Sequence, residues 1–232
     1  MELLGRAVLA HLGGAVTPVR FLRDDGYVDE QSAALFVDDT LGPHEAVLLD
    51  RCRGDVLDAG CGAGRLALPL QRRGARVAGL DISPTLVDIC RRRGVREVRV
   101  GDVWEDPGGP WDTVLLGGNN VGLGVTPAGA GRLLRHLVGT LRPGGAVVLT
   151  SVDVTRTTDA VHLAYHERNR AAGRSPGMVR LSLGFDDAQS EWFDWLHLAP
   201  AELRAVAAAV GLRVAVLDEH ASGAYAAAVT PA

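Results

Sequence analysis

The sequence predicts an α/β fold: a doubly wound, mostly parallel sheet of seven strands with an antiparallel edge strand. Short apolar runs alternate with helical patterns from about residue 54 onward, which is typical of a parallel sheet with helices on both faces. The runs 113–116 and 146–149 are apolar throughout, as strands covered on both sides require. Two short strands, expected near 212–217 and 224–229, form a final hairpin that makes one edge of the sheet antiparallel.

Several elements of this sheet have a clear local signal at one end. Ser83 can cap a helix that has Pro84 at its first position. The residues 142–145, Arg-Pro-Gly-Gly, end a helix and turn into the next strand. An alanine-rich helix opens at Pro200 and ends at Gly211. The first five strands are expected near 54–59, 75–80, 96–101, 112–118 and 144–151, and the helices between them near 64–73, 83–93 and 127–141.

Two segments depart from this alternation of strands and helices. Residues 1–50 hold helical pieces near 2–12 and 30–50, and we expect them to form an N-terminal helical lid over the ligand edge of the sheet. Residues 153–198 form an insertion after the fifth strand. Its expected elements are a helix, a Gly/Pro turn and two strands, near 157–171, 173–177, 178–185 and 190–198.

The composition excludes several classes of protein. The chain of 232 residues carries a net charge of −4 and no lysine, whereas a nucleic-acid binder carries a basic stripe. Its densest basic run, Arg91–Arg93, is interpreted as the solvated end of a helix. No apolar stretch approaches the ~18 residues of a membrane span, and no signal-peptide pattern is evident, so we expect a cytoplasmic protein. The three scattered cysteines favour neither a disulfide framework nor a metal site.

The most informative segment is 56–64, where a buried strand runs into the turn Asp-Ala-Gly-Cys-Gly-Ala-Gly. Glycines at such a turn let the backbone approach a ligand closely. A dinucleotide fingerprint needs a glycine where Arg65 stands, and a phosphate-binding Walker loop needs a lysine. Asp58 places a carboxylate at the end of the strand, which suits a ligand with an ammonium group better than a phosphate.

Polar residues also follow the next three strands, at the edge where ligands bind in open α/β sheets. Asp81 ends the second strand and can accept hydrogen bonds from both hydroxyls of a ribose. Asp102 ends the third strand and can accept from the exocyclic amine of an adenine, while the amide of Val103 can donate to a ring nitrogen. Asn119 and Asn120 follow the fourth strand.

This ordered series resembles the class I S-adenosylmethionine-dependent methyltransferases over residues 54–152, with a weaker match over 198–230. The shared features are D-x-G-x-G-x-G, the acid ending strand two, the Gly-Asp ending strand three, Asp112 entering strand four, and L-R-P-G-G before strand five. The resemblance implies a last strand inserted antiparallel and S-adenosylmethionine as the cofactor. The positions it assigns to cofactor binding are Asp58, Gly60, Cys61, Gly62, Asp81, Ile82, Asp102, Val103 and Asn119. Within this set Cys61 is interpreted as a packing residue of the turn and not as a nucleophile.

The chain is therefore expected to have four parts. The resemblance makes 51–152 the cofactor-binding core, completed by a helix and strands in 199–232. Residues 1–50 and 153–198 lie outside this core and interrupt its alternation, so we expect them to form the lid and the substrate-pocket insertion. A few related enzymes hold a divalent cation with acids after strands four and five. Asparagines stand at the first of these places, so no metal is expected.

The implied reaction is an in-line displacement, in which proximity and exclusion of water do most of the work. A general base matters only where the acceptor must lose a proton. The candidate catalytic residues are Tyr27 in the lid, His162 on the expected helix of the insertion, and His197 at the end of its second strand. His166 shares the helix face of His162, but the glutamate of zinc-protease motifs is missing. Packing or solvation is the competing interpretation for each of these side chains.

The expected function is therefore transfer of a methyl group from S-adenosylmethionine to an oxygen or nitrogen atom of a small molecule, with carbon as a further option. Two alternatives stay open. One is a methyltransferase for a macromolecule, although the residues 119–122 do not match the N-P-P-Y type motif. The other is a cofactor-binding protein of the same fold with non-methylating chemistry. The expected partner is a small-molecule substrate, without nucleic acid or membrane, and no oligomeric state is predicted.

Overall fold

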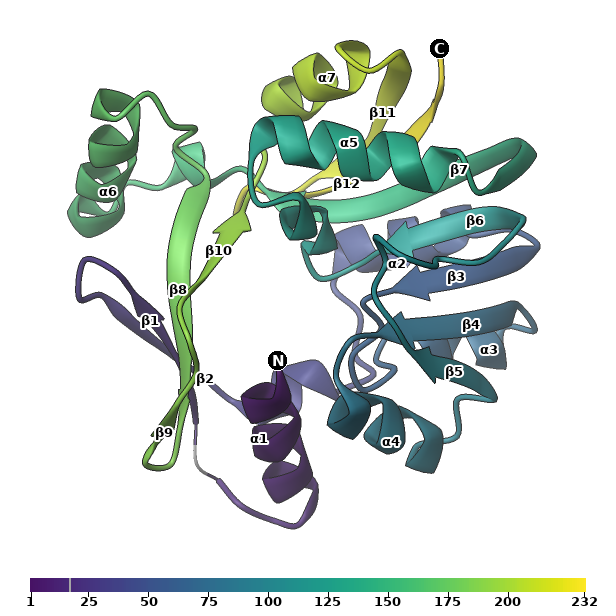
Figure 1. Ribbon diagram of the computed structural model, residues 1–232, viewed down its shortest axis with the longest axis horizontal. Coiled ribbons are helices and arrows are strands. Elements are labelled where there is room, and N and C mark those ends of the chain that lie inside the picture. Colours follow the sequence, from purple (N-terminus) through teal and green to yellow (C-terminus); the bar gives the residue numbers. More distant parts are fainter. Residues whose placement is uncertain (17) are drawn as a thin grey trace. The chain divides into compact units, whose positions relative to one another are not determined.

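The computed structural model describes residues 1–16 and 18–232, which form an α/β protein with two sheets (Figure 1). The larger sheet has seven strands in the order β11-β12-β7-β6-β3-β4-β5, which confirms the predicted sheet. Its strands are β3 (Asp55–Ala59), β4 (Arg76–Asp81), β5 (Glu97–Val100), β6 (Trp111–Leu116), β7 (Leu141–Val152), β11 (Leu212–Glu219) and β12 (Ala224–Pro231). The helices are α1 (Glu2–Leu12), α2 (Pro43–Arg51), α3 (Ala67–Arg72), α4 (Pro84–Arg92), α5 (Pro127–Val138), α6 (Ala160–Ala171) and α7 (Pro200–Ala208).

The chain divides into two compact units, which are described separately. The first unit comprises Met1–Thr40, Asp55–Pro107 and Arg180–Phe193. The second unit comprises Leu41–Gly54, Gly108–Val179 and Asp194–Ala232.

The first unit holds the glycine-rich turn and the strands on either side of it. Strands β3, β4 and β5 run parallel, with Val56 paired to Val77 and Gly79 to Val98. The Ser83 hydroxyl caps α4 by accepting from the Leu86 N–H at 3.2 Å, as its sequence predicts. Helix α3 begins at Ala67, later than the expected start near residue 64, because Gly64 adopts a left-handed φ of 81° that does not fit a helix.

The N-terminal part of this unit differs from the helical pieces that were expected. Helix α1 is present, but the expected helical piece at 30–50 is wrong over its first part. That part holds strand β2 (Val28–Gln31) and a short 3-10 turn, η1 (Ala33–Phe36), and α2 begins only at Pro43. The chain prefers a strand here because β2 pairs with β1 (Val19–Arg23), as in the pair Phe21 and Asp29.

The hairpin of β1 and β2 belongs to the smaller sheet, which has the order β10-β8-β1-β2, with β9 (Ala188–Gln189) paired to β8. Strand β8 (Met178–Phe185) pairs antiparallel with β1, as in the pair Phe21 and Leu183. The last strand is β10 (Phe193–Leu196). The two strands expected in the insertion are therefore present, but their partner from the N-terminal segment was not foreseen.

The second unit contains the antiparallel part of the larger sheet. Strand β12 pairs antiparallel with both β7 and β11, while β6 and β7 run parallel. Helices α5 and α7 pack together over one face of these strands, and α2 contacts β7, β11 and β12 from behind in the view of Figure 1. Strand β12 thus separates the edge strand β11 from the parallel part of the sheet, as the resemblance implied.

Candidate active site

The glycine-rich turn after β3 has open space beside one of its glycines and is tightly packed at another. The Gly60 and Cys61 N–H groups both donate to the Leu80 carbonyl, at 2.7 and 3.0 Å. At Gly62 (φ 53°) no described atom lies within 4 Å of where a Cβ would stand. At Gly64 a Cβ would lie 2.8 Å from the Cys90 sulfur. Gly62 therefore leaves backbone exposed to a ligand, whereas Gly64 is required by packing.

Asp58 is a buried carboxylate with an unsatisfied oxygen. It lies in β3 just before the turn, 2% exposed, and its Oδ2 has no hydrogen-bond partner among the described residues. Burial, followed by the negative charge of Asp81, raises the pKa of Asp58 to about 7. A buried anion of this kind is strongly destabilising unless a cation pairs with it. The position fits a ligand that brings a positive group.

Asp81 is fixed beside the same turn. Its Oδ2 accepts from the Gly62 N–H and its Oδ1 from the Ser83 N–H, both at 2.9 Å. Burial raises the pKa of Asp81 despite these two bonds. A carboxylate has about four acceptor positions, so two stay available for the hydroxyls of a sugar. The next side chain, Ile82, is 58% exposed and offers an apolar surface next to that carboxylate.

The remaining turn residues of the first unit have different environments. Asp102 accepts from the Trp104 N–H at 2.9 Å through Oδ1, and Val103 is buried. Cys61 is buried as well, and a Cβ on Gly79 of the neighbouring strand would lie 2.8 Å from its sulfur. The glycine in β4 thus makes room for the Cys61 thiol, which is a packing group here.

In the second unit, Asn119 follows β6 in a left-handed conformation with φ 65°. Its Nδ2 donates to the Leu196 carbonyl at 3.0 Å, and its Oδ1 accepts from the Ser151 hydroxyl at 2.6 Å. The Ser151 oxygen also accepts from the Leu198 N–H at 3.2 Å, and the Tyr225 hydroxyl donates to the Leu198 carbonyl at 2.7 Å. These bonds fix the short segment 196–198 at the carboxyl end of β7.

His197 stands in the middle of this fixed segment. Its N–H donates to the Gly177 carbonyl at 2.9 Å, and its Nδ1 is buried without a hydrogen-bond partner in the part of the chain that the structure describes. Burial, followed by the charge of His166, lowers the pKa of His197 to about 4. The imidazole of His197 is therefore neutral at physiological pH and can accept a hydrogen bond through its unprotonated ring nitrogen.

The structure brings His166, and not His162, into the electrostatic environment of His197. His166 is 4% exposed, whereas His162, one helical turn earlier on α6, is half-buried. The end of α6 is tied to the start of β8 by Asn169, whose Nδ2 donates to the Met178 carbonyl at 2.6 Å. The four-residue spacing predicts a shared helix face for His162 and His166. Only the return of the chain from α6 to β8 shows which of the two interacts with His197.

Tyr27 belongs to the first unit, in the hairpin between β1 and β2. The Arg23 guanidinium lies 4.8 Å from the centre of its ring and forms two hydrogen bonds with the Asp25 carboxylate, both at 2.8 Å. The hydrogen bond from Arg23 also lowers the pKa of Asp25. This Arg–Asp–Tyr cluster gives the hairpin turn a defined conformation.

The described residues, 1–16 and 18–232, contain no group of three or more His, Cys, Asp or Glu side chains placed to hold a metal ion. Their helices include none that is both long and apolar enough to cross a membrane. The absence of a metal in the working protein stays a prediction.

Comparison with known proteins agrees with this geometry. The family described as "Methyltransferase domain" matches residues 56–145. A magnesium-protoporphyrin O-methyltransferase of Rhodobacter capsulatus is 42% identical over 81 residues, which are 30% of this chain and 36% of that protein. A ribosomal protein L11 methyltransferase of Burkholderia mallei is 32% identical over 114 residues, 47% of this chain and 35% of that protein. The chain thus spans about a third of the length of these curated relatives.

A solved structure extends the likeness to the whole fold. The S-adenosylmethionine-dependent methyltransferase of Bacteroides fragilis, solved in complex with S-adenosyl-L-homocysteine, superimposes with a TM-score of 0.84 and 24% identity. The match covers 100% of this chain and 95% of that one, so it includes the N-terminal segment and the insertion. The chain thus contains a methyltransferase domain over residues 56–145, and it has the fold of this S-adenosylmethionine-dependent methyltransferase.

Proposed function

We propose that this protein transfers a methyl group from S-adenosylmethionine to an oxygen or nitrogen atom of a small molecule, with carbon as a further option. The observation that carries the proposal is the buried Asp58 carboxylate, whose Oδ2 lacks a partner among the described residues. It stands at a glycine turn that leaves space next to Gly62. This combination suits a ligand with an ammonium group and a close approach to backbone, which a nucleotide with a phosphate chain does not provide.

The residues present fit S-adenosylmethionine. When bound, this cofactor supplies an electrophilic methyl group on a sulfonium. Asp58 would pair with its ammonium group, and the backbone at Gly60 and Gly62 would lie along its methionine part. Asp81 would accept from the ribose hydroxyls. The remaining positions of the set are Ile82 against the adenine, Asp102 and Val103 at the adenine edge, the Asn119 carbonyl near the ammonium group, and Cys61 as packing beneath the turn.

His197 is the residue that we propose to handle the acceptor's proton. Its imidazole is held neutral by burial, and the bonds of Leu196 and Leu198 fix its backbone. A hydroxyl acceptor could donate a hydrogen bond to the ring and pass its proton to it as the methyl group is transferred. Tyr27 and His162 stay proposed contacts of the acceptor. An acceptor that is already ionised, or a free amine, needs no such base.

A macromolecular acceptor is the second candidate, because one curated relative is named for methylating a ribosomal protein. The small-molecule proposal is supported by another relative, whose name gives a porphyrin as its substrate. We also keep the prediction that the protein works in the cytoplasm and without nucleic acid, since its net charge is −4.

Two measurements test the proposal. Calorimetry with S-adenosylmethionine and S-adenosylhomocysteine should show binding of both, and absence of binding to either would contradict the cofactor assignment. A whole-cell extract that contains both metabolites and proteins, incubated with the enzyme and methyl-labelled cofactor, should then yield a labelled product of low mass, heavier than its precursor by one methylene. Label that appears only in protein would favour the macromolecular alternative, and binding without any transfer would favour non-methylating chemistry.

A further inference from the structure

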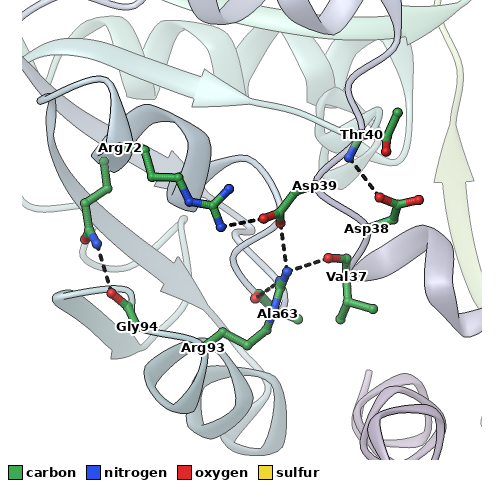
Figure 2. A network of polar contacts seen from close by, with 9 residues as sticks. Val37, Asp38, Asp39, Thr40, Ala63, Arg72, Arg93 and Gly94 are labelled. Carbon is green, nitrogen blue, oxygen red and sulfur yellow. Dashed lines mark hydrogen bonds and ion pairs between the residues drawn. The ribbon is translucent and has the colours of Figure 1, made fainter. Parts of the chain in front are cut away.

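Arg93 follows α4 and contacts the glycine turn at Ala63. Its side chain is only 16% exposed, so the interpretation of Arg91–Arg93 as a solvated helix end is wrong for this residue. One guanidinium nitrogen donates to the Ala63 carbonyl at 2.7 Å. The other donates to the Val37 carbonyl and to the Asp39 carboxylate, the latter at 2.9 Å (Figure 2).

The segment 37–40 is held by further arginines of the same unit. Figure 2 shows the Arg72 guanidinium directed to the other oxygen of Asp39, with which it forms an ion pair. Arg65, in the turn itself, donates to the Thr40 carbonyl at 3.3 Å. Three arginines from the cofactor-binding core thus converge on three residues of the N-terminal segment, Val37, Asp39 and Thr40.

Apolar packing joins the same parts. Ala63, which lies between two glycines of the turn, is 1% exposed and belongs to one buried cluster with Val37 and with Leu86 and Ile89 of α4. The cluster also takes in α1. A displacement of the segment 37–40 or of the turn would therefore remove a member of this buried cluster, Val37 or Ala63.

The N-terminal segment reaches the turn from a second side. Glu2 of α1 accepts hydrogen bonds from the hydroxyls of Ser83 and Thr85, which lower its pKa. Ser83 in turn donates its N–H to Asp81, and Asp81 accepts from Gly62. A continuous series of hydrogen bonds thus leads from the first turn of α1 to the open glycine of the candidate cofactor site.

Because Arg93 is charged, the turn and the segment 37–40 cannot easily move apart. A largely buried guanidinium needs its acceptors, because its charge cannot be removed at accessible pH. If the segment 37–40 moved away, Arg93 would lose the Val37 carbonyl and the Asp39 carboxylate and keep only Ala63 of these three. The turn and the segment are therefore coupled, and a coupling of this kind acts equally in both directions.

We propose that Arg93 is a positioning residue for cofactor binding, which fixes the glycine turn through Ala63 and makes order in the segment 37–40 depend on the bound cofactor. The inference rests on the proposed function for the identity of the ligand. The proposal gives the N-terminal segment a regulatory role. A change that increases the motion of the segment 37–40 lowers the affinity for the cofactor, and bound cofactor reduces the opening of this segment.

The test compares Arg93→Met with Arg92→Met in the full-length protein. Arg92 is 71% exposed and forms an ion pair with Asp88 one helical turn earlier, so it is a matched control on the same helix end. Arg93→Met should weaken S-adenosylmethionine binding about 5- to 150-fold in calorimetry, the usual range for coupled sites. Amide hydrogen exchange should show that the cofactor protects residues 37–40 in the wild type and in Arg92→Met, and not in Arg93→Met.

Asp39→Asn and Arg93→Lys supply milder versions that keep the fold if Arg93→Met does not. Both should reduce the cofactor-dependent protection of residues 37–40, with Arg93→Lys restoring part of the affinity lost in Arg93→Met. A merely structural role would lower the melting temperature and leave affinity and protection unchanged, which overturns the proposal. If the wild type binds neither S-adenosylmethionine nor its demethylated product, the proposed function fails together with this inference. Equal binding by wild type and Arg93 variants overturns the inference alone.

Discussion

The properties of single residues depend here on burial more than on residue type. Asp58 and Asp102 are both acids at strand ends, yet only Asp58 combines full burial with an oxygen that no described residue satisfies. Its position is unfavourable for the empty fold and favourable for a cationic ligand. A residue of this kind lowers the stability of the empty fold and raises the affinity for the ligand. Its substitution should therefore change stability and affinity in opposite directions.

Asp58→Asn should raise stability and abolish tight cofactor binding. The folded-state pKa of about 7 lies above the ordinary aspartate value of 3.8, so the folded protein binds more protons than the unfolded chain in this range and loses stability as the pH rises from about 4 to 7. The variant lacks this loss and should be more stable by roughly 2–4 kcal/mol at pH 8, with little difference near pH 4. Thermal unfolding across pH checks the first part, and calorimetry the second.

The same carboxylate predicts a pH dependence for binding in the wild type. Affinity for S-adenosylmethionine should increase as the pH rises through about 7, because Asp58 must ionise to pair with an ammonium group. Calorimetry in buffers of different ionisation enthalpy should also detect proton release on binding near neutral pH. A flat affinity between pH 6 and 8 would contradict the assignment of Asp58 to the cofactor's ammonium group.

Asp81→Ala should reduce cofactor affinity about 10- to 100-fold, the effect of losing charge-assisted hydrogen bonds worth ~1.5–3 kcal/mol. Its removal also frees the Gly62 and Ser83 N–H groups. Asp81→Asn separates the two effects, since an amide oxygen can keep one of these backbone bonds. Adenosine serves as a reporter ligand, because it has the ribose and lacks the methionine part.

His197→Ala should lower turnover far more than cofactor affinity. His136→Ala is the matched control, because it removes a half-buried histidine of α5 from the same unit, and this histidine has no part in the proposed site. Since the pKa of His197 is about 4, its neutral form dominates above pH 5, and it should impose no acid-side loss of rate between pH 6 and 8. Equal losses of turnover in both variants would contradict the proposed role of His197.

At the scale of elements, the N-terminal segment is part of a buried core of the first unit. Helix α1 packs on α4, and Leu3, Leu4, Ala7 and Val8 share a buried cluster with it. The sequence predicts that residues 1–50 form a lid over the ligand edge of the sheet. The packing adds a structural role, because loss of α1 uncovers α4 and releases Ser83 and Thr85 from Glu2.

Deletion of residues 1–16 should therefore weaken cofactor binding and lower the melting temperature, in addition to reducing turnover. Exposing apolar side chains of α4 costs about 25 cal/mol for each Å² uncovered. Glu2→Gln is the matched variant, since it keeps the helix and removes only the charge that accepts from the two hydroxyls. A truncated protein with wild-type affinity and stability would show that α1 contributes neither to cofactor binding nor to stability.

At the scale of the whole molecule, the sequence predicted what local patterns determine. The strands of the larger sheet follow from apolar runs and their punctuation, and the order of the motifs located the acids Asp58, Asp81 and Asp102 at strand ends. The small sheet was missed because β1 pairs with a strand far along the chain. The contacts of Arg93 and His197 were missed for the same reason, since the partners of both come from distant segments.

The doubly wound architecture itself does not decide which nucleotide binds, because the same fold class accommodates dinucleotides at the same edge of the sheet. The decision lies in the turn after β3. Arg65 occupies the place of the last fingerprint glycine, and Asp58 would set a buried carboxylate against a pyrophosphate.

NAD should therefore bind far more weakly than S-adenosylmethionine. In a displacement assay with labelled S-adenosylhomocysteine, low-micromolar NAD should leave the bound label in place, and Asp58→Asn should not create NAD binding, because Arg65 still blocks the fingerprint. Displacement of the label by NAD in the wild type would mean that the sheet, and not the turn, governs the choice of ligand.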